Sequence, residues 1–169
     1  MERVFIPKAR IMKLFGKRDL LEQLEHYSDC KLVLNKDENY IDLIGKDALS
    51  EYIAKDIVFA YGRGFDASVA AKLRDDEYYL KVIDIRDYTR NSGRIKRIKS
   101  RLIGARGRAR LNIEEMSSGY ISIYGDTVSI IGTTEQIKSA QIAAETIIKG
   151  GSHKLAYKRM ASLKEKGTE

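Results

Sequence analysis

Two glycines three positions apart, Gly104 and Gly107, mark the segment of this sequence best suited to hold a phosphate group. Glycine has no Cβ, so its backbone accepts positive φ and leaves room for a sugar–phosphate chain. A helix is expected to begin at the second glycine, where unpaired N–H groups and the helix dipole attract anions. Between the glycines lie the small Ala105 and the cationic Arg106. The Gly104–Gly107 turn therefore predicts a contact with a phosphate backbone.

The charged residues around this turn all have the same sign. Nine basic residues and no acid occupy the 21 positions from Arg90 to Arg110. Soluble helices usually mix both signs, so this run favours a polyanionic partner over a merely solvated surface. The cations predicted to contact that partner are Arg101, Arg106, Arg108 and Arg110.

Charge is also divided unevenly along the chain, which has 169 residues and a net charge of +7. Residues 1–88 carry 15 basic and 17 acidic side chains, a balance of −2, whereas residues 89–169 carry 16 and 7, a balance of +9. A polyanion is therefore expected to meet the C-terminal half first. Charge alone leaves RNA, DNA and an anionic membrane surface open as partners.

The elements that must position the turn follow from apolar periodicity. Apolar residues recur at helical spacing on both sides of the turn, and alternation after it predicts a strand pair. The expected order is a strand over 78–85, helices over 95–102 and 111–116, strands over 120–124 and 128–131, a long helix over 133–149, and a basic helical tail from 152. The Gly125-Asp126 pair is a hairpin signal between the two strands.

The first half of the chain repeats this order. Its turn begins at Gly16, its strands cover 31–34 and 40–44, and a helix follows Gly45 to about residue 61. Equivalent positions are separated by 88 residues at Gly16 and Gly104, 89 at Leu32 and Ile121, and 87 at Gly45 and Gly132. This near-constant offset indicates an internal duplication. We expect one module over 1–74, including a connecting helix over 66–74, and a second over 75–169, packed as one unit because the linker is short.

The turn of the first module departs from that of the second. It reads Gly16-Lys17-Arg18-Asp19, so that an acid replaces the second glycine. Asp19 removes the close approach and adds negative charge. Gly16, Lys17 and Arg18 are therefore weaker candidates for phosphate contact, and a structural or protein-binding role is expected for this module.

The order of helix, Gly-x-x-Gly turn, helix, strand, strand and helix resembles the KH domain of type I, the eukaryotic type, whose loop clamps about four nucleotides of single-stranded RNA. The resemblance implies an α+β fold of two tandem KH domains, each a three-stranded antiparallel sheet covered by helices. It also implies a groove for the bases beside the loop. Candidates for the groove wall are Ile103, Leu111, Ile121 and Ile123, although core packing is the alternative for each isoleucine.

Several longer segments are similar to the archaeal members of the partner-of-Nob family of ribosome-assembly factors. They are Arg63-Gly64-Phe65 and residues 76–85, 103–110, 122–128 and 151–158. The similarity implies binding near the 3′ end of small-subunit ribosomal RNA while that subunit matures. It implies two protein partners, the endonuclease that cuts this end and the alpha subunit of archaeal initiation factor two. A structural adaptor that acts mainly through protein contacts is the alternative.

The sequence contains none of the catalytic motifs that we considered. The sequence has no Gly-x-x-x-x-Gly-Lys-Ser/Thr loop, and one cysteine with two distant histidines cannot supply a zinc site. A metal nuclease needs clustered carboxylates, and the best cluster, Asp75-Asp76-Glu77, is typical of a solvated loop. We therefore expect a cytoplasmic binding protein with no catalytic residue, metal or cofactor, and with no contact with a membrane.

Overall fold

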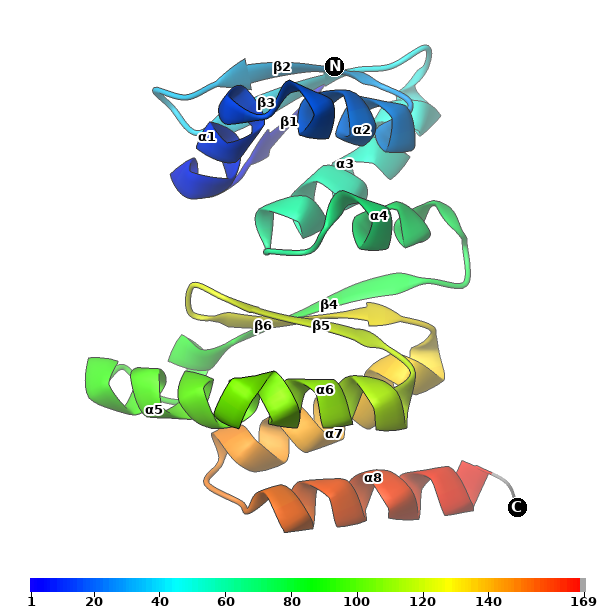
Figure 1. Ribbon diagram of the computed structural model, residues 1–169. Coiled ribbons are helices and arrows are strands. Elements are labelled where there is room, and N and C mark those ends of the chain that lie inside the picture. Colours follow the sequence, from blue (N-terminus) through cyan, green and yellow to red (C-terminus); the bar gives the residue numbers. More distant parts are fainter. Residues whose placement is uncertain (168–169) are drawn as a thin grey trace. The chain divides into compact units, whose positions relative to one another are not determined.

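The computed structural model describes residues 1–167 and divides into two compact units, Met1–Tyr78 and Tyr79 to the C-terminus (Figure 1). The division falls four residues after the expected module boundary, since the turn that precedes Tyr79 belongs to the first unit. Packing of the modules as one unit stays a prediction. None of the helices among residues 1–167 is both long and apolar enough to cross a bilayer.

The first unit holds a three-stranded antiparallel sheet with the strand order β1-β3-β2. Its elements are β1 (Glu2–Phe5), α1 (Lys8–Gly16), α2 (Arg18–Ser28), β2 (Lys31–Asn35), β3 (Tyr40–Ile44), α3 (Ala48–Gly62), α4 (Ala67–Ala70) and the 3-10 turn η1 (Ala71–Arg74). The connecting segment is thus a short helix that tightens into a 3-10 turn, rather than one helix over 66–74. Asp47 begins α3 by accepting a hydrogen bond from the Ser50 N–H at 2.8 Å.

The second unit repeats this architecture with the strand order β4-β6-β5 and adds a C-terminal helix. Its elements are β4 (Tyr79–Asp84), η2 (Ile85–Asp87), α5 (Ser92–Ile103), η3 (Ala105–Gly107), α6 (Arg108–Ser117), β5 (Tyr120–Tyr124), β6 (Thr127–Gly132), α7 (Thr134–Ile148) and α8 (His153–Gly167). Helices α5, α6 and α7 lie on one face of the sheet (Figure 1). The predicted α+β class and the three-stranded antiparallel sheet of each module are confirmed.

One hydrogen bond occurs at the same place in both units. The Glu25 carboxylate on α2 accepts from the Leu32 N–H at 3.1 Å, and the Glu114 carboxylate on α6 accepts from the Ile121 N–H at 3.0 Å. Both donors and both acceptors are separated by 89 residues. Each bond ties the start of a strand to the helix before it, so the duplication extends to individual contacts.

The core of the second unit explains how α5, α6 and α7 are held. Ile95 and Leu102 from α5, Ile113 from α6 and alanines from α7 join the inward side chains of the sheet in one apolar cluster. The small alanines let α7 approach its neighbours closely. Thr133 and Gln136 form a reciprocal capping box at the start of α7, which lies within the helix predicted over 133–149. Helix α8 packs against this cluster through the buried side chains of Ala156 and Met160.

The strand-tethering bond is testable at neighbouring glutamates. We expect Glu114→Ala to lower the free energy of unfolding by about 1–3 kcal/mol, because it leaves the Ile121 N–H and the Arg110 guanidinium without their shared partner. Urea denaturation followed by circular dichroism measures the change. The control is Glu115→Ala, whose exposed side chain has no partner within residues 1–167 and whose effect should stay within about 0.5 kcal/mol. Equal effects at the two positions would contradict the assignment.

Candidate nucleic-acid interface

The Gly104–Gly107 turn is built from backbone conformations that few residues adopt. Gly104 has φ 75° and ψ 172°, Arg106 has φ 57° and ψ 27°, and Gly107 has φ 74° and ψ 12°. The Gly104 N–H caps α5 by donating to the Ser100 carbonyl at 2.8 Å, and the Gly107 N–H donates to the Gly104 carbonyl at 3.1 Å. Three positive φ values in four residues reverse the chain sharply between α5 and α6.

The two glycines are needed for different reasons. A Cβ on Gly104 would lie 2.7 Å from both the Cβ and the backbone nitrogen of the buried Ala109, so α5 and α6 meet where no side chain fits. A Cβ on Gly107 would meet nothing within 4 Å. The backbone at Gly107 is therefore open on its outer side, which is the space that a sugar–phosphate chain requires.

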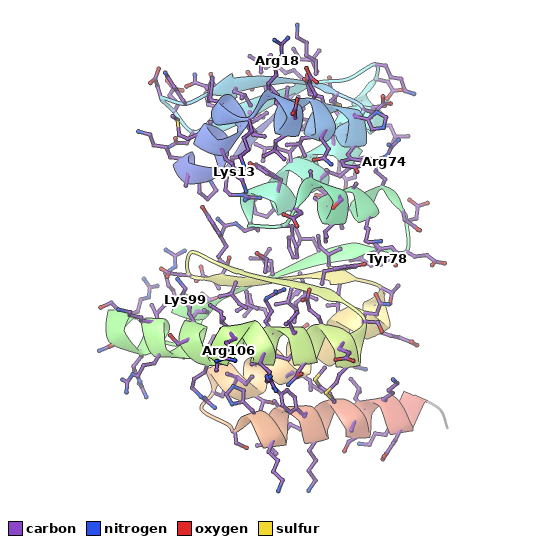
Figure 2. The ribbon with its side chains drawn as sticks, viewed as in Figure 1. Lys13, Arg18, Arg74, Tyr78, Lys99 and Arg106 are labelled. Atoms are coloured by element: carbon purple, nitrogen blue, oxygen red, sulfur yellow. The ribbon has the colours of Figure 1, made fainter. Side chains whose placement is uncertain are left out.

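Helix α6 presents an uncapped N-terminus at this open side. Its N-cap residue, Gly107, has no side chain with which to accept a hydrogen bond, and its first turn contains no acid. The Arg108 N–H donates to the Ala105 carbonyl, which leaves the following N–H groups of the first turn and the positive end of the dipole for an anion. The side chains of Arg106 and Arg108 are exposed and make no hydrogen bond or ion pair with residues 1–167. Figure 2 shows Arg106 on the helix-covered side of the unit.

Two other predicted contact residues have partners inside the protein. The Arg101 guanidinium donates to the carbonyls of Ile147 at 3.2 Å and Gly151 at 2.5 Å, which ties α5 to the end of α7. The Arg110 guanidinium lies 2.6 Å from the Glu114 carboxylate. Both arginines add to the positive potential near the turn, but their donors are already engaged in holding the helices together.

The predicted groove residues differ in how far they are exposed. Ile103 and Leu111, which lie just before and just after the turn, expose 38% and 51% of their surfaces. Ile123 is half-buried at the edge of the core, whereas Ile121 is only 5% exposed and belongs to the core. Ile103, Leu111 and Ile123 therefore expose apolar surface that bases could contact, whereas Ile121 packs in the core.

The first unit has no comparable turn. Helix α1 ends at Gly16 and α2 begins at Arg18, so Lys17 is the only residue between them, with φ −133° and ψ 94°. Asp19 lies in the first turn of α2 rather than in the connection. The exposed Gly16, Lys17 and Arg18 border an open depression of about 890 Å³ that also contains Asp19 and Glu22, and Arg18 pairs with Glu22 at 3.3 Å. The negative charges of Asp19 and Glu22 thus compensate the positive charges of Lys17 and Arg18.

Comparison with known proteins agrees with this geometry. The family described as the eukaryotic type KH domain (KH domain type I), in the form of the second KH domain of pno1, matches residues 79–165. A KH domain-containing protein of Methanocaldococcus jannaschii is 38% identical over 98% of this chain and 75% of its own length. The chain belongs to the pno1 family of KH-domain proteins. The predicted membership of the partner-of-Nob family is thereby confirmed.

Further similar proteins include two with solved structures and one from a fungus. Dim2p of Pyrococcus horikoshii is 34% identical with a TM-score of 0.84, covering 95% of this chain and 98% of that chain. A chain in the a/eIF2alpha–aDim2p–rRNA complex of that organism is 35% identical with a TM-score of 0.87, covering 98% and 94%. The pre-rRNA-processing protein pno1 of Emericella nidulans is 34% identical over 57% of this chain and 38% of its own length. This chain thus spans less than half of that fungal relative.

The different needs of the glycines predict different costs of substitution. We expect Gly107→Ala to lower the free energy of unfolding by about 1–2 kcal/mol, the strain of a positive φ. Gly104→Ala should cost about 1–3 kcal/mol more, because its methyl group also collides with Ala109. Gly16→Ala is the control: Gly16 ends a helix with no neighbour in the way, so alanine should be neutral or stabilise by up to about 1 kcal/mol. Urea denaturation of the three variants gives the order, and equal costs at Gly104 and Gly107 would refute the close approach.

Proposed function

We propose that this protein binds single-stranded RNA through the Gly104–Gly107 turn, and that its target lies near the 3′ end of small-subunit ribosomal RNA during ribosome biogenesis. The observation that carries the proposal is the uncapped N-terminus of α6, which opens beside the unobstructed Gly107 and two unpaired arginines. The relatives support the choice of RNA, since one is named a pre-rRNA-processing protein and another stands in a complex with rRNA.

Binding in this arrangement needs no covalent chemistry. The phosphates lie against the first N–H groups of α6 and are held by Arg106 and Arg108, while about four nucleotides follow the turn. The bases turn towards the exposed apolar side chains of Ile103 and Leu111 and towards Ile123. The protein contributes position and charge, so we propose a binding role without catalysis.

A second role, as an adaptor for proteins, is favoured by the surface of the first unit. This unit keeps the KH architecture without the glycine turn, and it exposes large apolar side chains. Leu49 and Tyr52 on α3 are 67% and 66% exposed, and they lie three positions apart on one helical face. Exposed apolar groups that lie together are typical of protein contact sites. We assign the proposed protein partners, the endonuclease and the alpha subunit of initiation factor two, to this unit.

The turn is tested by placing negative charge on the phosphate path. We expect Ala105→Asp/Arg106→Asp to reduce affinity for a single-stranded RNA from the rRNA 3′ end at least about a hundredfold, because two carboxylates would face the phosphates. Fluorescence anisotropy measures binding, and circular dichroism checks that the fold is kept. Gly16→Asp/Lys17→Asp makes the same change of three charges in the first unit and should alter affinity by less than about threefold. Wild-type affinity in the turn variant would exclude the turn as the site.

Salt dependence tests whether phosphates supply the binding energy. For a strand that contacts the protein through about four phosphates, the logarithm of the association constant should fall with the logarithm of salt concentration with a slope of about −2.8. Titrations of wild-type protein at increasing KCl concentrations give this slope. An affinity that does not change with salt would show that base or protein contacts dominate instead.

A further inference from the structure

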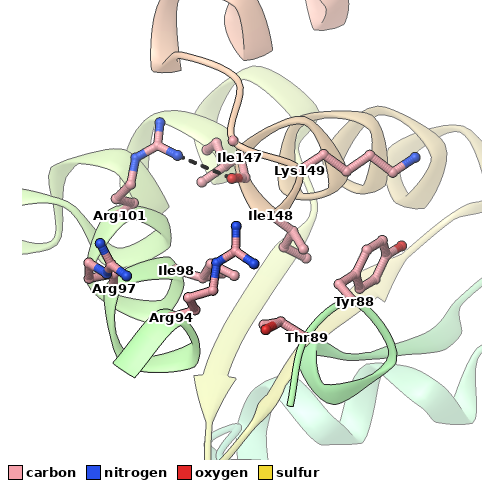
Figure 3. Close-up of a pocket in the computed structure, with 10 residues that line it drawn as sticks. Tyr88, Thr89, Arg94, Arg97, Ile98, Arg101, Ile147, Ile148 and Lys149 are labelled. Carbon is pink, nitrogen blue, oxygen red and sulfur yellow. Dashed lines mark hydrogen bonds between the residues drawn. The ribbon is translucent and has the colours of Figure 1, made fainter. Parts of the chain in front are cut away.

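A second basic site lies away from the turn, in a pocket between α5, the end of α7 and the residues that follow η2. Its volume is about 510 Å³, within the range of small-molecule sites. Arg94, Arg97 and Arg101 line it from α5, and Lys149 lines it from the end of α7. Figure 3 shows the three arginines on one side of the pocket and Tyr88 on the other.

The charge in this pocket is unbalanced. Its lining contains four cations and no carboxylate. The side chains of Arg94, Arg97 and Lys149 make no hydrogen bond or ion pair with any part of the described chain, residues 1–167. Glu145 and Asp87 lie outside this lining but close to Tyr88: burial, and then the charges of Glu145 and Asp87, raise the pKa of the Tyr88 hydroxyl, and the Glu145 carboxylate already accepts from the Gln141 amide at 2.9 Å. Cations that converge without a counter-charge are a binding site for an anion.

Helix capping does not account for these cations. The C-terminus of α7 carries partial negative charge, which attracts basic residues. Two of its last three carbonyls are already paired, however: the Thr146 carbonyl accepts from the Gly151 N–H at 2.8 Å, and the Ile147 carbonyl accepts from the Gly150 N–H and from Arg101. The Arg101 side chain thus pairs with carbonyls of the protein, whereas the side chains of Arg94 and Arg97 have no such partner.

The pocket also offers apolar surface beside the charges. The half-buried Ile98 and Tyr88, which is 40% exposed, form part of its lining, and the buried Ile147 and Ile148 lie beneath them in the core. A bare ion would need only the cations, whereas a nucleotide combines a phosphate with a flat, largely apolar base. Arg97 and Arg94 precede the end of α5 at Ile103 by six and nine residues, which places them about 9 and 14 Å from the turn along the helix.

We propose that this pocket is a second RNA subsite, which holds one nucleotide of the strand that flanks the segment on the Gly104–Gly107 turn. Arg94 and Arg97 bind its phosphate, and its base packs against Ile98 and Tyr88. The inference rests on the proposed function, because it extends the same RNA beyond the four nucleotides of the turn. It makes affinity depend on RNA length in a way that the turn alone does not.

The test compares two lengths of RNA with one pair of substitutions in the full chain. We expect Arg94→Gln/Arg97→Gln to weaken binding of an RNA of about twelve nucleotides roughly tenfold, and to leave binding of its central four nucleotides within about twofold. The slope of affinity against salt for the longer RNA should become shallower by about 0.7, the equivalent of one phosphate. Arg97→Gln alone should lose about threefold on the longer RNA, which keeps the test valid if the double variant is poorly folded.

The matched control is Lys154→Gln/Lys158→Gln on α8, which removes the same two charges from exposed positions outside the pocket. It should show no length-dependent loss. Equal losses on both RNA lengths, or no loss on either, in the pocket variant would overturn the subsite, as would a loss confined to an acidic polypeptide such as polyglutamate. Ala105→Asp/Arg106→Asp separates the two hypotheses: if it abolishes binding while the pocket variant does nothing, only the subsite fails, and if it changes nothing, the proposed function fails.

Discussion

Helices α5 and α6 meet at a point where the backbone of Gly104 lies against Ala109, and this contact determines the rest of the site. Because no side chain stands between the helices, the chain must turn within four residues, which requires positive φ at Gly104, Arg106 and Gly107. The turn also places the N-terminus of α6 beside the side chains of Arg106 and Arg108. The closeness of the two helices, the strain of the turn and the position of the charge therefore have a common origin.

The two units show that the fold and this turn are separable. Both keep the sheet order and the bond from a helix glutamate to the first strand after it, at Glu25 and Glu114. Only the second unit keeps a connection long enough to form the glycine turn, because Lys17 alone joins α1 to α2. The first unit lacks the turn and keeps the tethering bond, so the architecture does not depend on the glycine turn.

Much of this arrangement could be predicted from local sequence signals. Apolar periodicity predicts the helices and strands, and the Gly125-Asp126 pair predicts the hairpin between β5 and β6, because these signals act within a few residues. The interaction of Arg101 with Ile147 could not be predicted, since 46 residues separate the partners. The burial of Ile121 depends on which face of β5 packs against the helices. Alternation alone does not distinguish Ile121 from Ile123, which lies on the same face of the strand but is half-buried. The spacing of Arg94, Arg97 and Arg101 does indicate a shared helical face, but Lys149 and Tyr88 join it only through the fold.

Arg101 has a further consequence for the energetics of recognition. Its side chain fastens the helix that leads into the turn to the end of α7, and its own carbonyl lies 2.8 Å from the Nε2 atom of His153 on α8. Three helices are thereby joined at a residue three positions before the first glycine. A turn held in this way loses little conformational entropy when an RNA strand arrives, so more of the contact energy is retained as affinity. If the turn is the RNA site that we propose, the C-terminal helix contributes to binding by holding the turn in its conformation beforehand.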